Sequence, residues 1–201
     1  MDSGLKNKTV ILTGASGGIG SACARAFAAE GARLVLHART RPEAAQRLAA
    51  ELPVETLVVA ADLRDETEVG HLFEAAIGRF GTLDVLVANA GIWPPEEVPV
   101  ARLSLERWND TIASDLTSVF LCARGFLAHL EARRAEAASI VMIGSTAAVF
   151  GEAGHADYAA AKAALTYGLT RTPPGWTRSG ASIPASRRTS SAQPKSFSNF
   201  W

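Results

Sequence analysis

The chain has 201 residues, 20 basic and 20 acidic residues, and 48% apolar residues, which is the composition of a globular domain with one core. The zero net charge offers no basic surface to a phosphate backbone, which argues against a dedicated nucleic-acid binder. No apolar run approaches the roughly 18 residues of a membrane-spanning helix, and the polar first residues lack the apolar stretch of a signal peptide, so we expect no membrane association and a cytoplasmic location.

Apolar runs and helical patterns alternate along the first 171 residues. Short β-branched or apolar runs predict five strands at 8–13, 34–38, 56–62, 83–91 and 139–145. Apolar positions at helical spacing predict helices at 18–30, 42–52, 66–80, 104–133 and 155–171. Strands that alternate with helices predict an α/β fold, a doubly wound parallel sheet with helices on both faces. The uninterrupted apolar run of the fourth strand predicts that both of its sides are covered.

The composition changes after Arg171. Pro173 and Pro174 end the last predicted helix, because proline cannot continue a helix and restricts the residue before it. Residues 172–201 include 16 Ser, Thr, Pro or Gly and four basic but no acidic residues. This composition predicts a disordered tail. We therefore expect two parts, a folded domain at 1–171 and an atypical tail at 172–201.

A glycine-rich turn joins the first strand to the first helix. Glycines at this place allow a tight turn and let the backbone approach a pyrophosphate, whose charge then lies at the positive end of the helix. The alternative is a compact turn without a ligand. The position between strand and helix favours a dinucleotide site. The residues of the turn that we expect to contact the dinucleotide are Gly14, Ser16, Gly18, Ile19 and Gly20.

The end of the second strand bears on which dinucleotide binds. A carboxylate there holds the ribose 2′-hydroxyl of NAD, whereas a basic group favours the 2′-phosphate of NADP. This strand ends in His37, Ala38 and Arg39, with Arg41 close behind and no acidic residue. We expect Arg39 to favour NADP (NADPH), and NAD is the alternative cofactor. The alternative without a ligand is that both arginines are ordinary solvated surface residues. His37 is interpreted as a packed or surface residue.

Three residues near the end of the domain indicate proton transfer. Tyr158 and Lys162 lie four residues apart in a predicted helix, which places both side chains on one face. A free phenol has a pKa of about 10, and a neighbouring ammonium lowers it toward the range that acid–base catalysis needs. Ser145 ends the fifth strand, and the carboxyl ends of strands are where such sheets bind ligands. Each residue also has an ordinary interpretation, as a strand-end cap, a packed ring or a surface charge.

Four motifs, in order and on the expected elements, resemble the short-chain dehydrogenase/reductase family in its smaller single-domain branch. The motifs are TGASGGIG at 13–20, an acidic residue after the third strand at Asp62, Asn89-Ala90-Gly91, and Ser145 with Tyr158 to Lys162. The resemblance covers about residues 5–171 and implies a Rossmann-like dinucleotide-binding domain that also carries the catalytic residues. An epimerase-like enzyme of the larger branch would need a substrate domain that this chain is too short to build.

The resemblance also implies roles for individual residues. It implies that Asp62 and Leu63 contact the adenine and that Asn89, Ala90 and Gly91 line the cofactor cleft. Lys162 would bind the nicotinamide ribose and tune the phenol, so Tyr158 and Lys162 are expected at the cofactor as well. In reduction, Tyr158 would protonate a carbonyl oxygen that Ser145 positions while hydride arrives, and oxidation of an alcohol is the same path reversed.

The chain departs from the family pattern at Asp115. Many members carry an asparagine there, which helps to hold a water-linked proton relay behind the lysine. An ionised aspartate accepts hydrogen bonds but does not donate as an amide does, and its charge would pair with Lys162. We expect Asp115 to take part in catalysis through a weakened relay.

The second departure is the region after Arg171. The family normally adds a sixth strand, a substrate-covering segment and a seventh strand, and none of these is recognisable here. This favours a shifted reading frame or a truncated gene product. Two hypotheses follow: an NAD(P)-dependent oxidoreductase acting on a small-molecule carbonyl or secondary alcohol, or a catalytically impaired member that only binds dinucleotide or a partner.

Further expectations concern assembly and alternative chemistry. The resemblance suggests a homo-oligomer built partly on the helices at 104–133 and 156–171. A hydrolase triad of Ser145 with His155 and Asp157 lacks the G-x-S-x-G elbow. No metal-ligand spacing occurs among the four histidines, so we expect no metal site.

Overall fold

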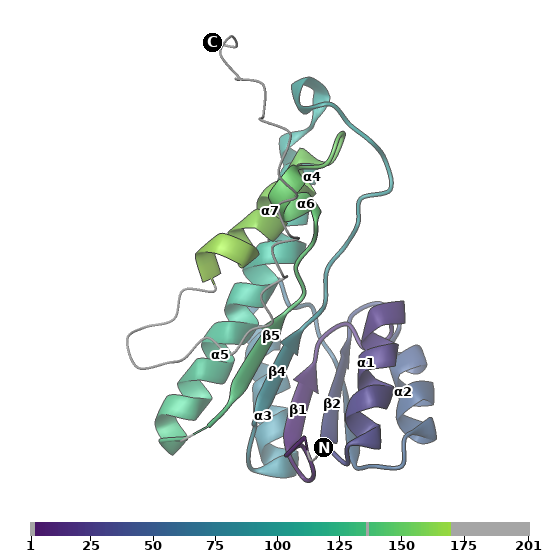
Figure 1. Cartoon of the computed structure of the whole chain (residues 1–201), viewed down its shortest axis with the longest axis vertical. Coiled ribbons are helices and arrows are strands. Elements are labelled where there is room, and N and C mark those ends of the chain that lie inside the picture. The colour runs from purple at the N-terminus through teal and green to yellow at the C-terminus, as the bar shows by residue number, and fades with distance from the viewer. Residues whose placement is uncertain (1–2, 136, 170–201) are drawn as a thin grey trace, which may run out of the picture. The chain divides into compact units, whose positions relative to one another are not determined.

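The computed structural model describes residues 3–135 and 137–169. Its centre is a five-stranded parallel sheet with the strand order β3-β2-β1-β4-β5 (Figure 1). The strands are β1 (Thr9–Leu12), β2 (Arg33–Ala38), β3 (Thr56–Ala60), β4 (Val85–Ala88) and β5 (Ser139–Met142). The order reverses its direction between β1 and β4, which is the arrangement of a Rossmann-like sheet. The predicted fold class is confirmed.

The helices follow the strands in the predicted alternation. They are α1 (Gly18–Ala29), α2 (Pro42–Glu51), α3 (Glu66–Phe80), α4 (Leu105–Ile112), α5 (Ser118–Arg133), α6 (Ala147–Phe150) and α7 (Ala156–Ala164). A π-helical turn, η2 (Ala113–Thr117), joins α4 to α5, another, η3 (Leu165–Leu169), extends α7, and a short 3-10 turn, η1, spans Val100–Arg102. The sequence predicted one helix where α4, η2 and α5 now lie, and it predicted neither α6 nor η1.

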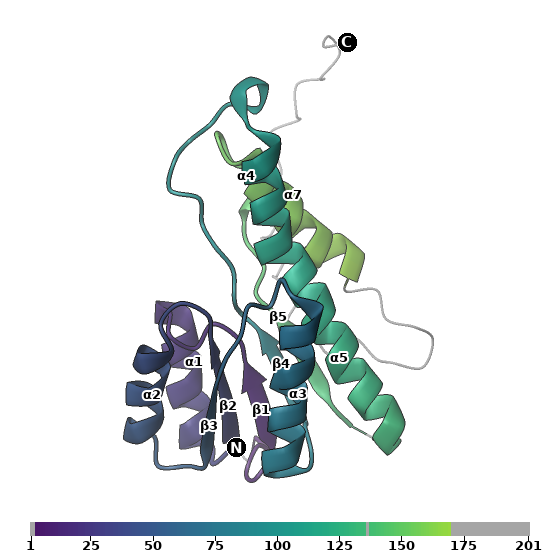
Figure 2. The ribbon, with the colours of Figure 1, turned by 180° about the vertical axis from the view of Figure 1, so that it is seen from behind.

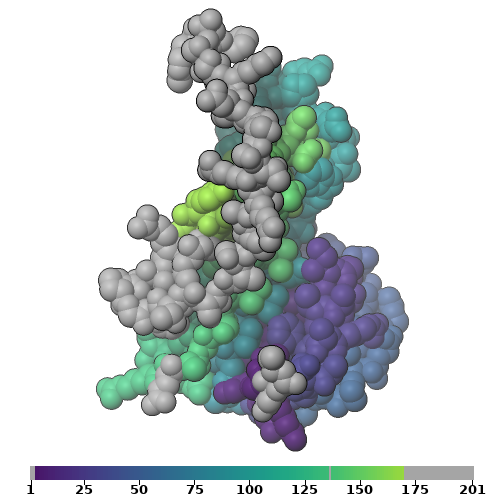
Figure 3. Space-filling model, viewed as in Figure 1, coloured from purple at the N-terminus to yellow at the C-terminus, as the bar shows by residue number. Residues whose placement is uncertain are grey.

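Alternate residues of the strands face two separate apolar layers. On one side of the sheet, Val10, Leu12, Leu34 and Leu36 pack with residues of α1 and α2 such as Ala24 and Leu48. On the other side, Ile11, Val35 and Leu86 pack with residues of α3 and α5 such as Leu72 and Phe126. Figures 1 and 2 show the pair α1 and α2 on one face of the sheet and the pair α3 and α5 on the other. In the space-filling view, α1 and α2 cover their face of the sheet (Figure 3). All four residues of β4 are buried, as its apolar run predicted.

The stretch Leu105–Arg133 has the length and hydropathy that a bilayer-spanning helix needs, and it is the one such stretch among the described residues. Half of its most apolar window is buried inside the fold. Val119, Cys122, Phe126 and Leu130 of α5 are buried, and most of these pack in the layer that covers the sheet. Packing in a core explains this composition as well as a membrane would, and one such helix is weak evidence for a membrane span.

The predicted tail at 172–201 and the end of the last predicted helix lie outside the described residues. The division into a domain at 1–171 and a separate tail stays a prediction.

The buried ring of Phe126 provides a test of the second apolar layer. Phe126 is fully buried, so Phe126→Ala is expected to lower the free energy of unfolding by about 3–5 kcal/mol through lost burial and the cavity left behind. Phe120 lies in the same helix but is 42% exposed, with Arg124 over its ring. Phe120→Ala should therefore lower the free energy of unfolding by only about 1 kcal/mol. Urea unfolding followed by circular dichroism measures both, and equal losses would contradict this packing.

Candidate active site

The turn after β1 brings two backbone segments into contact. Gly14 has a φ of +68°, and a Cβ there would stand 2.9 Å from the Cα of Ala90. A Cβ at Gly20 would overlap the carbonyl oxygen of Gly14. Only glycine fits these two positions, and α1 therefore begins directly beneath the end of β1. Helix α1 has Gly17 as its N-cap, without a side-chain cap.

Hydrogen bonds from the residues that follow β4 hold this turn. The hydroxyl oxygen of Thr13 accepts from the backbone N–H groups of Asn89 and Ala90, both at 2.9 Å. In return, the Asn89 side-chain amide donates to the carbonyl oxygens of Thr13 at 2.9 Å and Gly14 at 3.3 Å. Asn89 thus fixes the position of the turn in addition to lining the space beside it.

His37 of β2 holds the turn from the other side. Its Nδ1 accepts from the backbone N–H of Gly14 at 3.2 Å, and its Nε2 lies 2.9 Å from the carbonyl oxygen of Ala61. The side chain is buried, and this burial lowers the pKa of His37. A packed or surface residue was expected here, but the contact with Gly14 was not predicted, because it joins β2 to a turn 23 residues away.

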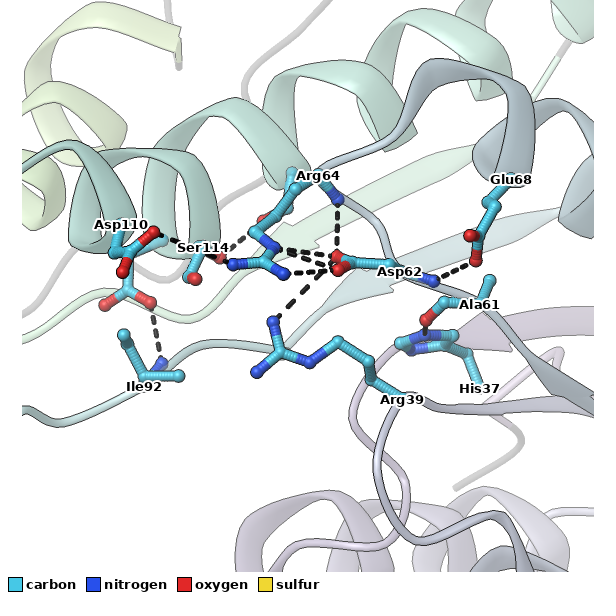
Figure 4. Close-up of polar contacts among 11 residues, drawn as sticks. His37, Arg39, Ala61, Asp62, Arg64, Glu68, Ile92, Asp110 and Ser114 are labelled. Atoms are coloured by element: carbon cyan, nitrogen blue, oxygen red, sulfur yellow. Dashed lines mark hydrogen bonds and ion pairs between the residues drawn. The ribbon is translucent and has the colours of Figure 1, made fainter. Parts of the chain in front are cut away.

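Charged side chains gather where β2 and β3 end (Figure 4). Two nitrogens of Arg64, Nε and Nη2, donate to the carboxylate of Asp62, and Arg39 lies 3.8 Å from the same carboxylate. The hydrogen bonds from Arg64 hold the pKa of Asp62 below its usual value. Arg64 also reaches Asp110 of α4 at 3.9 Å. Arg64 was not predicted, because its role depends on α4 lying next to the end of β3.

A cleft with a volume of about 360 Å³ opens at the carboxyl ends of the strands. Its lining includes every residue of the turn and of the neighbouring strand ends that the sequence analysis assigned to a cofactor: Gly14, Ser16, Gly18, Ile19, Gly20, Arg39, Asp62, Leu63, Asn89, Ala90 and Gly91. Other residues also line the cleft but were not predicted to contact the cofactor, among them His37, Arg64, Ser114 and Ser118. That the assigned residues bind a cofactor stays a prediction.

Lys162 lies next to both the cleft and Tyr158. Its Nζ is 5.6 Å from the centre of the Tyr158 ring and donates to the carbonyl oxygen of Ile143 at 3.3 Å. A Cβ at Gly91, which lines the cleft, would stand 3.3 Å from this Nζ. Burial lowers the pKa of Lys162, and the charge of Asp115 opposes this shift. The ammonium therefore lies close to Gly91 and beside the ring of Tyr158, while neither Lys162 nor Tyr158 is among the residues that line the cleft.

Asp115 is fully buried in the π-helical turn η2. Its Oδ1 accepts from the backbone N–H of Ile92 at 2.6 Å, and its Oδ2 has no hydrogen-bond partner in the described part of the chain. Burial raises the pKa of Asp115. No ion pair within 4.0 Å joins it to Lys162 in residues 3–135 and 137–169, so the expected charge pair acts only at longer range. Its direct contact is with the loop after β4.

Ser145 lies at the carboxyl end of β5, before α6. Its Oγ accepts from the backbone N–H of Ala147 at 3.2 Å, which is its one side-chain hydrogen bond to another described residue. This bond leaves the O–H free to donate. The structure therefore places Ser145 at the predicted edge of the sheet and joins it to Ala147 rather than to Tyr158.

The ring of Tyr158 packs edge-on against Trp93, with 4.8 Å between ring centres, and the Trp93 ring also lies tilted against His155 with 4.1 Å between ring centres. The preceding residue, Asp157, is fully buried and accepts hydrogen bonds from Arg107 at 3.0 Å and Thr111 at 2.9 Å. Burial opposes ionisation of Asp157, but these bonds keep its pKa below the usual value. His155 and Asp157 are thus engaged with Trp93 and Arg107 instead of forming a triad with Ser145.

The fold and the cleft together define a Rossmann-like α/β protein with a polar side-chain cluster at the edge of the cleft. The family model described as short chain dehydrogenase matches residues 8–173, and the chain belongs to this family. The family implies a nicotinamide dinucleotide, NAD(P), as the cofactor. No group of three or more His, Cys, Asp or Glu side chains that could hold a metal ion occurs among the described residues.

Several characterised proteins are similar to this chain. It is 37% identical to cis-4-hydroxycyclohexanecarboxylate dehydrogenase of Sinomonas cyclohexanicum. The 174 aligned residues cover 86% of this chain and 68% of that protein. It is 34% identical to 3-oxoacyl-[acyl-carrier-protein] reductase FabG of Escherichia coli K12, over 80% of this chain and 64% of that protein. A crystal structure of a short chain dehydrogenase from Mycobacterium avium superposes with a TM-score of 0.72 at 34% identity, over 80% of this chain and 61% of that one. The chain spans about two thirds of the length of its relatives.

The raised pKa of Asp115 predicts a pH-dependent gain in stability for Asp115→Asn. Because the fold disfavours the ionised carboxylate, the penalty is absent below the pKa of the unfolded chain and grows as the pH rises toward the folded-state pKa. The variant should gain about 1–2 kcal/mol in free energy of unfolding at about pH 7 and nothing at about pH 3. Urea unfolding at both pH values measures this difference.

Asp110→Asn is the matched control. It removes the same charge from α4 at a side chain that is 65% exposed, so its effect should stay within about 0.5 kcal/mol at either pH. A loss of stability in Asp115→Asn at neutral pH, or a gain that does not change with pH, would contradict the conclusion that burial disfavours the ionised form of Asp115.

Proposed function

We propose that the chain is an NADP-preferring oxidoreductase that transfers a hydride between the nicotinamide and the carbonyl or secondary alcohol of a small molecule, with Tyr158 as the general acid and base. The observation that carries the proposal is the position of Lys162: its Nζ would stand 3.3 Å from a Cβ at Gly91, and Gly91 lines the cleft. The buried ammonium beside Tyr158 is thereby joined to a space with the features of a phosphate site.

The cleft fits a dinucleotide in size and in chemistry. Its volume lies within the range of ligand pockets, about 300–1,000 Å³. The glycines at 14 and 20 let a phosphate approach the backbone, and α1 begins at Gly18 with N–H groups that no side chain caps. Gly14, Ser16, Gly18, Ile19 and Gly20 would hold the pyrophosphate there.

The balance of charge at the far end of the cleft supports NADP over NAD. Arg39, Arg41 and Arg64 line this end, and Asp62 is the acidic residue among the lining side chains. Arg64 balances the charge of the Asp62 carboxylate through its hydrogen bonds. The positive charges of Arg39 and Arg41 then have no matching negative charge among the lining residues. A guanidinium is well suited to a 2′-phosphate, which it can bind with two hydrogen bonds.

The side chains near Tyr158 can perform the proton transfer that accompanies hydride transfer. The bound dinucleotide supplies or accepts the hydride. In reduction, the Tyr158 hydroxyl gives its proton to the carbonyl oxygen, and the O–H of Ser145 donates to the same oxygen and holds it in place. The ammonium of Lys162 stabilises the phenolate that remains. In oxidation, Tyr158 takes the alcohol proton instead.

Replacing the phenol tests the chemistry. Tyr158→Phe should lower turnover by about 10²–10⁴-fold, the usual contribution of a positioned acid or base, and leave NADPH binding in place. The assay follows nicotinamide absorbance with cyclic secondary alcohols and 3-oxoacyl thioesters, because the similar proteins are named for substrates of these kinds. Tyr167→Phe is the matched control, since that ring is 61% exposed in η3.

The outcome separates the two hypotheses for this chain. Turnover that survives in Tyr158→Phe would overturn the role of the phenol. Saturable NADPH binding without turnover on any substrate of the panel would instead favour a catalytically impaired, dinucleotide-binding member of the family.

A second prediction concerns the choice of cofactor. Arg39→Ala should weaken NADPH binding by about 10–100-fold, the equivalent of one charge-assisted hydrogen bond, and leave NADH binding nearly unchanged. Titration of nicotinamide fluorescence measures both affinities. Arg47→Ala removes the same charge from an exposed position of α2 that does not line the cleft, and it should change neither affinity. Equal losses for NADPH and NADH in Arg39→Ala would speak against a 2′-phosphate contact.

The same titration can be made with Lys162→Ala. This variant should bind NADPH and NADH more weakly, because it loses the predicted contact with the nicotinamide ribose that both cofactors share. The cytoplasmic location and the homo-oligomer stay predictions.

A further inference from the structure

The imidazole of His37 joins the two halves of the cleft. It lies between the phosphate-binding turn and the strand end that carries Asp62, is only 2% exposed, and lines the cleft itself. One ring nitrogen contacts the backbone of Gly14 and the other that of Ala61, the residue directly before Asp62. A single side chain therefore connects the two places at which a dinucleotide would be held.

The two contacts together define the protonation state of the ring. The N–H of Gly14 points at Nδ1 from 3.2 Å, so Nδ1 must be an acceptor and carry no proton. The carbonyl of Ala61 lies 2.9 Å from Nε2, so Nε2 must carry the proton and donate it. Only the neutral Nε2–H form satisfies both partners. A second proton would place an N–H of the ring against the N–H of Gly14.

The peptide group between Thr13 and Gly14 is held by this ring on one side and by Asn89 on the other. The Asn89 amide donates to the carbonyl oxygen of Thr13 at 2.9 Å, and His37 accepts from the N–H of Gly14. Protonation of His37 would break one of the two restraints at a position where the φ of +68° and the contact with Ala90 leave little freedom to adjust. The shape of the phosphate-binding turn would change with it.

We propose that His37 is a positioning residue for the cofactor: in its neutral Nε2–H form it holds the turn at Gly14 in the shape that binds the dinucleotide, and protonation of its ring releases the turn and weakens binding. This inference rests on the proposed function. It adds a pH dependence of cofactor affinity that originates away from Tyr158 and Lys162.

The groups around the ring determine where this change occurs. Burial lowers the pKa of His37, the backbone contact with Ala61 raises it, Arg39 beyond the end of β2 lowers it, and Asp62 beyond the end of β3 raises it. From α3, the Glu68 carboxylate accepts from the backbone N–H of Asp62 at 2.5 Å. Arg41 and Arg64 line the same cleft. The net direction is downward, so the neutral ring is the form at neutral pH and the loss of affinity comes below the ordinary pKa of histidine.

The test compares NADPH and NADH binding of the wild-type chain and His37→Asn from about pH 8 to about pH 5. Asparagine keeps an oxygen that can accept from the N–H of Gly14 but does not titrate. At about pH 8, His37→Asn should bind within about tenfold of wild type, because it loses the hydrogen bond to Ala61. At lower pH, wild-type affinity should fall relative to the variant by up to about tenfold per pH unit, the slope for one proton.

The design removes the main confounding effects. The 2′-phosphate of NADPH titrates in this pH range, but it does so equally for both chains, and NADH lacks it. Unfolding at low pH is followed by circular dichroism on the same samples. A wild-type affinity with the same pH profile as His37→Asn would overturn the inference while leaving the proposed function intact. A folded wild-type chain that binds neither cofactor at about pH 8 would overturn both.

A second measurement requires no variant. The ¹⁵N chemical shifts of the ring nitrogens of His37 in the wild-type chain distinguish the two neutral tautomers and report their titration. The inference requires the Nε2–H tautomer and a downward-shifted pKa. The opposite tautomer, or a ring that is already doubly protonated at neutral pH, would overturn it.

Discussion

The cleft depends on one backbone contact, the approach of Gly20 to the carbonyl of Gly14. Any side chain at residue 20 would occupy the space of that oxygen, so α1 could not begin where it does. With the contact in place, the first turn of α1 faces the ends of β1 and β4 and offers its N–H groups to an anion. Asn89 after β4 and His37 of β2 then hold the turn through hydrogen bonds to Thr13 and Gly14.

Local patterns were enough to predict the sheet and most of its helices. Helix α3 has the predicted bounds, because Asp65 caps its start with two hydrogen bonds and Gly81 ends it with a φ of 73°, and both signals are visible in the sequence. The residues expected at the pyrophosphate and the adenine line the cleft for a related reason. They lie at strand ends, and the ends of parallel strands meet at one edge.

The features that sequence could not predict depend on contacts between distant segments. The π-helical turn η2 breaks the register of a stretch that has one continuous helical pattern, and it turns the carboxylate of Asp115 toward the loop after β4. Likewise, the polar partners of His37 and Arg64 belong to other elements. No local propensity encodes such partners, and the fold accepts the unfavourable desolvation of both Asp115 and Lys162.

The hydrogen bonds from Arg64 to Asp62 also affect how a ligand reaches the cleft. With that carboxylate neutralised by its partner, Arg39 and Arg41 give their end of the cleft a positive potential that attracts anions before any contact forms. Such attraction extends only about 8 Å at physiological ionic strength and about 30 Å in dilute salt. The rate of association with an anionic nucleotide should therefore slow as salt is added, while the rate of dissociation, governed by short contacts inside the cleft, changes much less.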